Sequence, residues 1–389
     1  MILSRRAFAA AGLALPFAAR VAEAAIPAGR KFVVIVCRGG MDGLSVAPPL
    51  GDPDYRSLRG ALALGDEALK LDATFALNPA LPAIHALATA GEARIAPAVA
   101  TPDRARSHFE AQDVLETGAP GVYATTSGWL NRAVQAMGKV EAISVGPTAP
   151  LILRGAAPAG SWSPGGRVIE AGARLPGLLQ DLYKDDPLLG PALARGLATE
   201  TLARESGAAG GDAMMRAGPA QGREAARAMG SALADFLRAP GGPQIAAVSL
   251  DGFDTHANQA TLLGVRLTSL DALVDGLHTG LGPEWKNTLV LGITEFGRTA
   301  RANGTGGTDH GTGSTALVLG GALKRGGIVG DWPTLKRQAL FEDRDVYPAL
   351  DLRGLSKGLL TDHLGLERTA LDSLVFPDSA AVRPLSGIV

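Results

Sequence analysis

TLVLGITEFGRTARANGTGGTDHGTGSTALVL, from Thr288 to Leu319, contains two short apolar runs on either side of a polar segment rich in glycine. Short apolar runs that are bounded by glycine and polar residues are typical of buried β-strands. We therefore predict strands at Leu289–Ile293 and Thr315–Leu319, with a loop between them. We expect this loop to form one wall of an active site. Its ionisable side chains include Glu295, Arg298, Asp309 and His310.

Three further apolar runs predict strands of the same sheet: Lys31–Cys37, Arg94–Ala100 and Gln244–Leu250. The first is a continuous, β-branched run, which suits a strand buried on both faces of a parallel sheet. In open α/β sheets the ligand crevice lies beyond the carboxyl ends of the strands. We therefore expect the polar clusters after these strands to converge on the glycine-rich loop. These clusters are Arg38 and Asp42, then Ser107 and His108, then Asp251, Asp254 and His256.

The residue types in these clusters indicate metal or nucleophilic chemistry. Carboxylates and neutral imidazoles are ligands of zinc, manganese and similar ions, and Asp254 and His256 are close enough in sequence to bind one ion. Ser107 and His108 are expected to face the same pocket from a loop or the N-terminus of a helix. A structural explanation also exists, because Asp42 and Asp254 suit turns or caps and Ser107 suits the cap of a helix that begins at His108.

The composition excludes several classes of protein. The 389 residues are 46% hydrophobic and 19% charged with a net charge of -1, so the chain has enough apolar residues for a large core and lacks the basic face of a nucleic-acid-binding protein. The single cysteine, Cys37, excludes an intrachain disulfide and a CxxC metal site, and we expect it to be buried. Beyond the N-terminus, the sequence has no uninterrupted apolar stretch of about 18 residues, the length that a membrane helix needs.

The N-terminal segment has the features of an export signal. Arg5 and Arg6 precede an apolar stretch at residues 9–19, and Ala22-Glu23-Ala24 offers a cleavage site. This pattern predicts a twin-arginine signal peptide over residues 1–24, export by the twin-arginine translocase, and a mature protein in the periplasm. An ordinary secretory signal with a chance arginine pair is the alternative.

The remaining chain, residues 25–389, is predicted to form a single α/β domain. Residues of about 175–240 are rich in Ala, Leu and Arg with helical spacing, which predicts a helical insertion or a cap over the cleft. A helix from Asn78 to Ala90 is predicted with Asn78 as its N-cap and Pro79 at its first position. A further strand is predicted at Leu151–Arg154.

Five segments together resemble domain-of-unknown-function family 1501, a set of largely twin-arginine-exported bacterial proteins. These segments are RGGMDGLS, RSHFEAQD, GFDTHANQ, TEFGRT and GGTDHGTGS. The family is similar in fold to the alkaline phosphatase and sulfatase superfamily. The resemblance implies a three-layer α/β/α fold with a mostly parallel central sheet, and one or two divalent metals (Zn, Mn, Ca or Mg) at the strand ends.

The resemblance also implies roles for individual residues. Asp42 matches a metal-binding carboxylate after the first strand, and Ser107 matches a nucleophile. Where the superfamily typically has Asp-His after the penultimate strand, this chain has Glu295-Phe296, and phenylalanine does not bind metal. The predicted metal ligands are Asp42, Asp254, His256, Glu295, Asp309 and His310. The predicted catalytic residues are Ser107, His108 and Arg298, and the predicted substrate-binding residues are Arg38 and Arg298.

Two functions agree with this pattern. The first is a periplasmic, metal-assisted hydrolase of phosphate or sulfate esters, whose substrate is a small molecule or a polysaccharide. The second is a non-catalytic binding protein on a degenerate hydrolase scaffold, which the altered Glu295-Phe296 pair favours. Binding that survives replacement of Asp254 and His256 would favour the second function.

Overall fold

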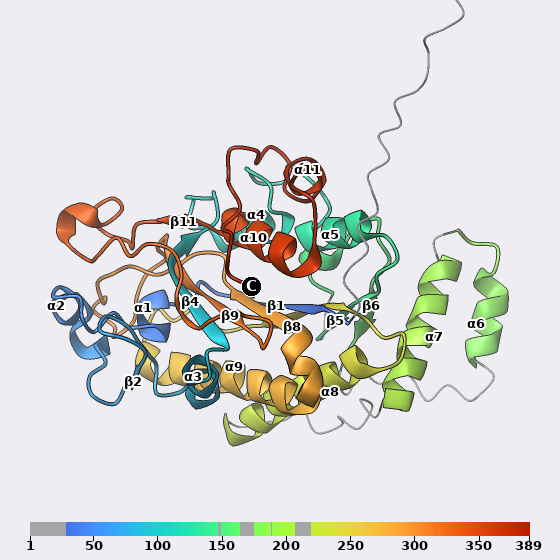
Figure 1. Ribbon diagram of the computed structural model, residues 1–389, viewed down its shortest axis with the longest axis horizontal. Helices are drawn as coiled ribbons and strands as arrows, with labels where there is room; N and C mark the ends of the chain where they lie inside the picture. The colour runs from blue at the N-terminus through green and yellow to red at the C-terminus, as the bar shows by residue number, and fades with distance from the viewer. Residues whose placement is uncertain (1–28, 147–148, 164–174, 188, 207–218) are drawn as a thin grey trace, which may run out of the picture.

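A nine-stranded sheet forms the centre of the computed structural model, which describes residues 29–146, 149–163, 175–187, 189–206 and 219–389 (Figure 1). The predicted signal peptide, residues 1–24, lies outside this range. From one edge to the other, the strand order is β10 (Gly327–Ile328), β4 (Ala93–Ala100), β9 (Ser314–Leu319), β8 (Thr288–Ile293), β1 (Lys31–Cys37), β7 (Ile245–Leu250), β5 (Ala142–Val145) and β6 (Gly160–Trp162), and β11 (Leu350–Asp351) pairs with β4.

The sheet is mostly parallel, as predicted. Strand β1 lies between β7 and β8 and is parallel to both, so that Val36 is paired with Ser249 on one side and Ile293 on the other. Strand β9 is antiparallel to both of its neighbours, β8 and β4. It follows that the carboxyl ends of β1, β4, β7 and β8 all lie on the same side of the sheet, where β9 begins. We refer to this side, which runs across the strand ends, as the shared edge of the sheet.

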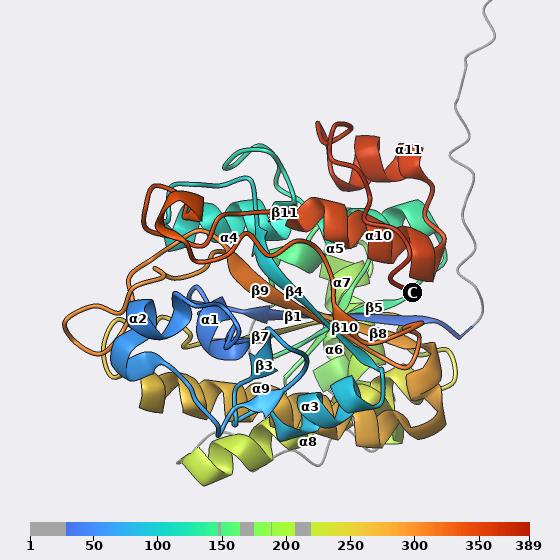
Figure 2. The same ribbon diagram turned by 60° about the vertical axis from the view of Figure 1, so that its left-hand side comes forward.

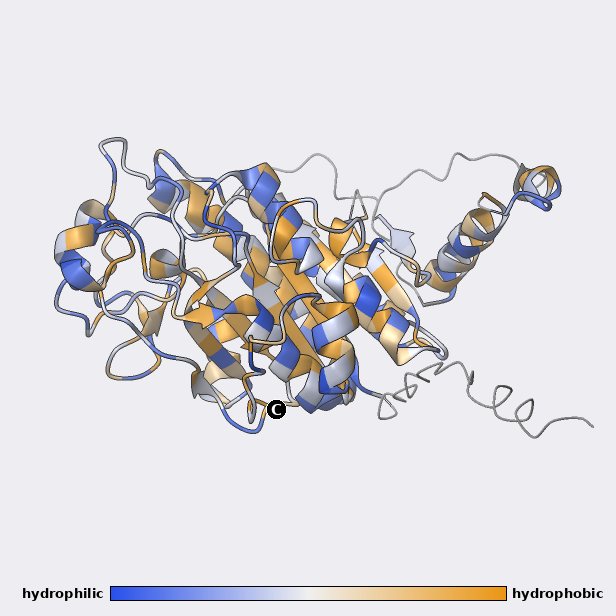
Figure 3. Cartoon of the chain, turned by 90° about the horizontal axis from the view of Figure 1, so that it is seen from above, coloured by the Kyte–Doolittle hydropathy of each residue, from blue (hydrophilic) through white to orange (hydrophobic). Residues whose placement is uncertain are grey.

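Helices cover both faces of the sheet, which gives three layers (Figure 2). The residues of β1 alternate between two apolar cores. Val33 and Ile35 face the core beneath α3 (Pro82–Thr89), α8 (Pro219–Arg238) and α9 (Gln259–Leu281). Phe32 and Val34 face the core that includes α5 (Trp129–Met137) and α10 (Leu352–Leu364). The mixed α/β fold class is therefore confirmed. Figure 3 shows that the strands at the centre of the molecule are mostly hydrophobic.

The shorter elements lie mainly around the sheet. They include α1 (Gly43–Val46), α2 (Tyr55–Arg59), α4 (His108–Thr117), α11 (Arg368–Ala370) and the small sheet of β2 (Leu69–Lys70) and β3 (Ala76–Leu77). Cys37, at the end of β1, is fully buried, as expected. No helix in the described part of the chain is long and apolar enough to cross a membrane.

Two local predictions were wrong. The helix expected from Asn78 begins at Pro82, because the carboxamide of Asn78 instead accepts a hydrogen bond from the backbone of Ala80 in a turn. The strand expected at Leu151–Arg154 is a short 3-10 helix, Leu151–Leu153. A four-residue apolar run does not by itself distinguish a strand from a buried helical turn.

The segment around 175–240 contains α6 (Leu175–Tyr183), α7 (Leu189–Ser206) and α8. Helix α8 packs along α9 beneath the sheet (Figure 1). Leu202 and Glu205 of α7 line a cavity with Lys31, which is the first residue of β1. This part of α7 therefore lies near the start of β1, away from the strand ends that carry the polar clusters.

Candidate metal centre

The polar clusters meet at the shared edge of the sheet. Helix α4 follows β4 and begins at His108, Asp254 and His256 follow β7, and the β8–β9 loop supplies His310. The sheet topology explains this convergence, because all of these segments leave or enter the sheet at one edge.

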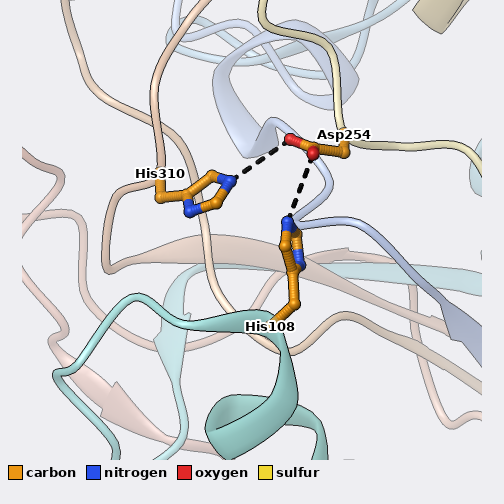
Figure 4. A group of neighbouring side chains, drawn as sticks. All are labelled: His108, Asp254 and His310. Carbon is orange, nitrogen blue, oxygen red and sulfur yellow. Dashed lines mark hydrogen bonds and ion pairs between the residues drawn. The ribbon is translucent and has the colours of Figure 1, made fainter.

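Three imidazoles surround the carboxylate of Asp254. The Nε2 atoms of His108 and His310 each lie 3.3 Å from an oxygen of Asp254 (Figure 4). The Nε2 of His256 lies 3.0 Å from the Asp254 Oδ1 and 3.0 Å from the Nε2 of His310. One ligand atom each of His108, Asp254 and His310 lies within 4.8 Å of the others, which is close enough for all three to hold one ion.

The second nitrogen of each ring contacts an oxygen. His108 Nδ1 lies 3.0 Å from Oε1 of Glu295, His310 Nδ1 lies 2.9 Å from the backbone oxygen of Arg106, and His256 Nδ1 lies 3.3 Å from Oδ1 of Asp309. Oxygens of this kind accept hydrogen bonds, so the neutral rings of His108 and His310 carry their hydrogen on Nδ1 and leave a lone pair on Nε2. The ring of His256 has a carboxylate oxygen near each nitrogen, so either nitrogen can carry the hydrogen.

These contacts test whether the residues suit a metal. In neutral rings of this tautomer, the Nε2 lone pairs meet the lone pairs of an ionised Asp254, an arrangement that is repulsive unless a proton or a cation lies between them. Among the described residues, the Nε2 of His108 is buried with no hydrogen-bond partner. The donor set of imidazole nitrogens and one carboxylate therefore fits a divalent transition ion.

Glu295 is buried at the back of this site, with 1% of its surface exposed. It also accepts hydrogen bonds from the backbone of Gly39 at 2.8 Å and from Nε2 of Gln112 at 3.1 Å. Burial raises the pKa of Glu295, but these hydrogen bonds together with that of His108 outweigh it and hold the pKa below its ordinary value. The hydrogen bond to Glu295 is also the main reason that the pKa of His108 is raised.

Arg298 is buried behind Asp254. Its Nη1 donates to Asp254 Oδ1 at 2.6 Å, and its other donors bind the backbone oxygen and the hydroxyl of Thr308. Burial raises the pKa of Asp254, but the hydrogen bond and charge of Arg298 outweigh that effect and keep the carboxylate ionised. In contrast, burial lowers the pKa of His310, which favours the neutral ring that a metal requires.

Asp42 belongs to a neighbouring, separate cluster. Its side chain is 1% exposed and forms an ion pair with Arg59, which is itself fully buried. The Asp42 carboxylate also accepts from Ser45 at 2.7 Å and from Gln259. The Oε1 of Gln259 accepts from the hydroxyl of Thr308 at 2.6 Å, and this contact links the Asp42 cluster to Arg298.

The other predicted residues lie around the site. The Arg38 guanidinium lies 2.6 Å from Glu116 and donates to Gln112 at 3.0 Å, so it already has protein partners. Ser107 is the N-cap residue of α4, as its structural interpretation predicts, but within the described structure its side chain makes no capping hydrogen bond. Its hydroxyl is therefore available for another role.

The sequence interpretation missed the residues that orient the site. Gln112 lies four positions after His108 on α4, and this spacing places both side chains on the same helix face. That spacing was a usable signal. The partner of His310 is the backbone oxygen of Arg106, which adopts a left-handed conformation with φ 57. A backbone acceptor leaves no signal in the side-chain pattern.

Comparison with known proteins places the chain in a family. Residues 70–375 match the family described as protein of unknown function (DUF1501). The chain belongs to this family. The matched range includes His108, Asp254, His256 and His310, whereas Asp42 precedes it. No curated protein matches the sequence.

Solved structures resemble the chain only distantly. One is Ps i-CgsB in complex with k-i-k-neocarrahexaose, with 12% identity, a TM-score of 0.40, and coverage of 91% of this chain and 77% of that chain. Another is the C-terminal periplasmic domain of EcEptC from Escherichia coli in complex with Zn, with 12% identity, a TM-score of 0.38, and coverage of 91% and 87%. A third is alkaline phosphatase from the Antarctic bacterium TAB5, with 12% identity, a TM-score of 0.38, and coverage of 77% and 94%.

Proposed function

We propose that this DUF1501 protein is a metal-assisted hydrolase of phosphate or sulfate esters. The observation that supports this proposal best is the convergence of three imidazole Nε2 atoms on the carboxylate of Asp254. The proposed ligands are His108, Asp254, His256 and His310. Because three of these four donors are nitrogen, the set favours zinc over magnesium or calcium, which prefer oxygen ligands.

When bound, a divalent ion polarises an ester oxygen and lowers the pKa of a coordinated water or hydroxyl. The residues of the chain prepare the site for this chemistry. Arg298 holds the Asp254 carboxylate in place through a 2.6 Å hydrogen bond, and its positive charge attracts an anionic ester. The hydroxyl of Ser107, which directly precedes His108, is the proposed nucleophile. The Arg38 side chain is 19% exposed and paired with Glu116, so its proposed contact with substrate requires that pair to rearrange.

The proposed localisation is the periplasm, and the protein is proposed to be exported by the twin-arginine pathway before it encounters its substrate. This part of the proposal rests on Arg5 and Arg6 and on the apolar stretch that follows them. The proposed substrate is a small-molecule or polysaccharide ester.

The test is hydrolysis of p-nitrophenyl phosphate and p-nitrophenyl sulfate by zinc-loaded protein, with bound zinc measured in the same samples. We expect turnover that is lost in His310→Ala and reduced at least a hundredfold in Ser107→Ala, whose fold and zinc content should be normal. Asp343→Asn is the control, because this carboxylate pairs with Arg337 on the surface. A wild-type protein that binds no zinc and hydrolyses neither ester contradicts the proposal.

A non-catalytic binding protein is the second candidate. It is favoured by the carboxylate partners of Arg38 and Arg298, because paired guanidinium groups are less able to clamp an anion. Zinc binding without hydrolysis of either ester, and with no effect of Ser107→Ala, would support this candidate.

A further inference from the structure

We propose that Glu295 is a positioning residue for the metal centre, and that it acts by fixing the ring of His108 rather than by binding the ion. This inference rests on the proposed metal-assisted function. It assigns the altered Glu295-Phe296 pair to a structural task in the site, and so removes the main sequence argument for a degenerate scaffold.

The hydrogen bonds of Glu295 argue against its being a ligand. Its Oε1 accepts from three donors: the backbone of Gly39 at 2.8 Å, Nε2 of Gln112 at 3.1 Å and Nδ1 of His108 at 3.0 Å. Its Oε2 accepts from the hydroxyl of Thr294 at 3.0 Å. Oε1, which has three N–H donors, therefore has no lone pair left for a metal, and Oε2 is already bonded to the hydroxyl of Thr294.

The same hydrogen bonds make Glu295 effective at orienting His108. The carboxylate is 1% exposed and held on several sides, so the ring that donates to it is fixed both in rotation and in tautomer. Nε2 then faces Asp254, at 3.3 Å, with its lone pair available. A carboxylate behind a ligating histidine also raises the basicity of the ring and so strengthens its bond to the metal.

Phe296 completes this support. Its ring centroid lies 4.9 Å from that of His108 and 4.9 Å from that of His310. Phe296 is 5% exposed, and it packs so closely over Gly40 that a Cβ there would lie 2.4 Å from its ring. The two imidazoles also contact each other, with ring centroids 4.4 Å apart, so the phenylalanine packs against both rings and limits their movement.

The next two residues of the segment contribute as well. A Cβ on Gly297 would lie 1.9 Å from the backbone oxygen of Gly313, so only glycine lets the two ends of the loop approach each other. Arg298 then holds Asp254. The four residues Glu295 to Arg298 thus each position a ligand or the loop that carries one.

The test measures zinc affinity by competition with a chromophoric chelator, in the full-length protein and two variants. Glu295→Gln keeps a hydrogen-bond acceptor but removes the charge, whereas Glu295→Ala removes both. We expect the dissociation constant to rise roughly tenfold in Glu295→Gln and roughly a hundredfold in Glu295→Ala. Asp271→Asn is the matched control, because Asp271 is also a buried carboxylate but accepts from the backbone of Ala83 and Ile84, and this variant should bind zinc as the wild type does.

A second measurement separates positioning from folding and from metal binding. Nitrogen-15 NMR of metal-free protein, at a pH where the imidazole of His108 is neutral, reports the tautomer of each ring. We expect His108 to carry its hydrogen on Nδ1 in the wild type and in Glu295→Gln, and to lose this preference in Glu295→Ala. Unchanged zinc affinity in both Glu295 variants would overturn the inference while leaving the proposed function intact. A wild type that binds no zinc would overturn the proposed function, whereas the tautomer of His108 would still decide whether Glu295 orients the ring.

Discussion

Asp42 and Asp254 were both predicted to bind metal, and the structure gives them very different surroundings. The Asp42 side chain is 1% exposed and faces a guanidinium, a hydroxyl and a carboxamide that belong to the protein itself. The Asp254 side chain is 38% exposed and faces three imidazoles together with Arg298. Both carboxylates follow strands that end at the same edge of the sheet.

The difference shows what makes a carboxylate available to a metal. In the Asp42 cluster, the internal cation Arg59 already balances the negative charge, and the remaining lone pairs accept hydrogen bonds. In the Asp254 cluster, Arg298 also balances the charge, but the other neighbours are three imidazoles, which can lose a proton and bind a metal. The first cluster should therefore contribute to folding and the second to metal binding.

The largest expected effect tests the folding role of the Asp42 cluster. Arg59→Met leaves Asp42 charged and buried without its partner, and breaking such a pair costs about 3–5 kcal/mol of unfolding free energy. Urea unfolding in the presence of a chelator measures this loss. Arg298→Met is the matched control, because Arg298 is equally buried but its partner Asp254 reaches water, so a loss of only about 1–2 kcal/mol is expected. Equal losses in the two variants would remove the distinction between the clusters.

The next effect is the loss of stability at low pH, to which a histidine outside both clusters should contribute. Burial lowers the pKa of His363, in α10, to about 4. The unfolded chain therefore binds a proton at higher pH than the folded protein does, and stability falls as the pH drops from about 6.5 towards 4, by about 3 kcal/mol in total. His108 has the opposite sign, since its hydrogen bond to Glu295 raises its pKa and so favours the folded, protonated state.

Unfolding curves in chelator between pH 7 and pH 4 check this assignment. In His363→Gln, whose amide can still donate to the backbone oxygen of Lys31, the loss of stability below pH 6.5 should be smaller by about the 3 kcal/mol assigned to His363. If the variant and the wild type lose the same unfolding free energy between pH 7 and pH 4, His363 is not the group that responds to acid. The acid response must then come from other groups, including those of the two clusters.

The fold could be predicted closely because long apolar runs define strands with little ambiguity. The predicted Lys31–Cys37 coincides with β1, and the predicted Gln244–Leu250 differs from β7 by one residue. The prediction failed where the apolar run was only four residues long, and where two residues both suited the start of a helix. Pro79 and Pro82 both suit the first turn of a helix, and the chain uses the second.

For the site, the sequence indicated which residues would reach the edge of the sheet but not what would face them. Arg59 lies in α2, well outside any motif, and nothing in its surroundings marks it as the partner of Asp42. Whether a carboxylate is neutralised internally depends on three-dimensional packing. The prediction of Glu295 as a ligand rested on a sequence correspondence, whereas its several hydrogen bonds appear only in the folded chain.

Stabilisation by zinc should depend on the Asp254 cluster and not on the Asp42 cluster. A ligand that binds only the folded state at one hundred times its dissociation constant stabilises the protein by about 2.7 kcal/mol. We expect this stabilisation in the wild type and in Asp42→Asn, and its loss in His310→Ala. Thermal unfolding with and without zinc, starting from chelator-treated protein, measures it. Loss of the zinc effect in Asp42→Asn would show that Asp42 is a ligand after all.

The smallest expected effect compares the two carboxylates that lie behind the histidines. Asp309 contacts His256 Nδ1 at 3.3 Å, much as Glu295 contacts His108, but its side chain is 54% exposed whereas that of Glu295 is buried. Water competes for an exposed carboxylate, so its hydrogen bond is worth no more than about 1 kcal/mol. Asp309→Asn should therefore raise the zinc dissociation constant less than about fivefold, which is a smaller change than that of Glu295→Gln. The same chelator competition measures both variants. If Asp309→Asn weakens zinc binding as much as Glu295→Gln does, burial is not what makes a carboxylate effective behind a metal ligand, and Asp309 must then be tested as a ligand itself.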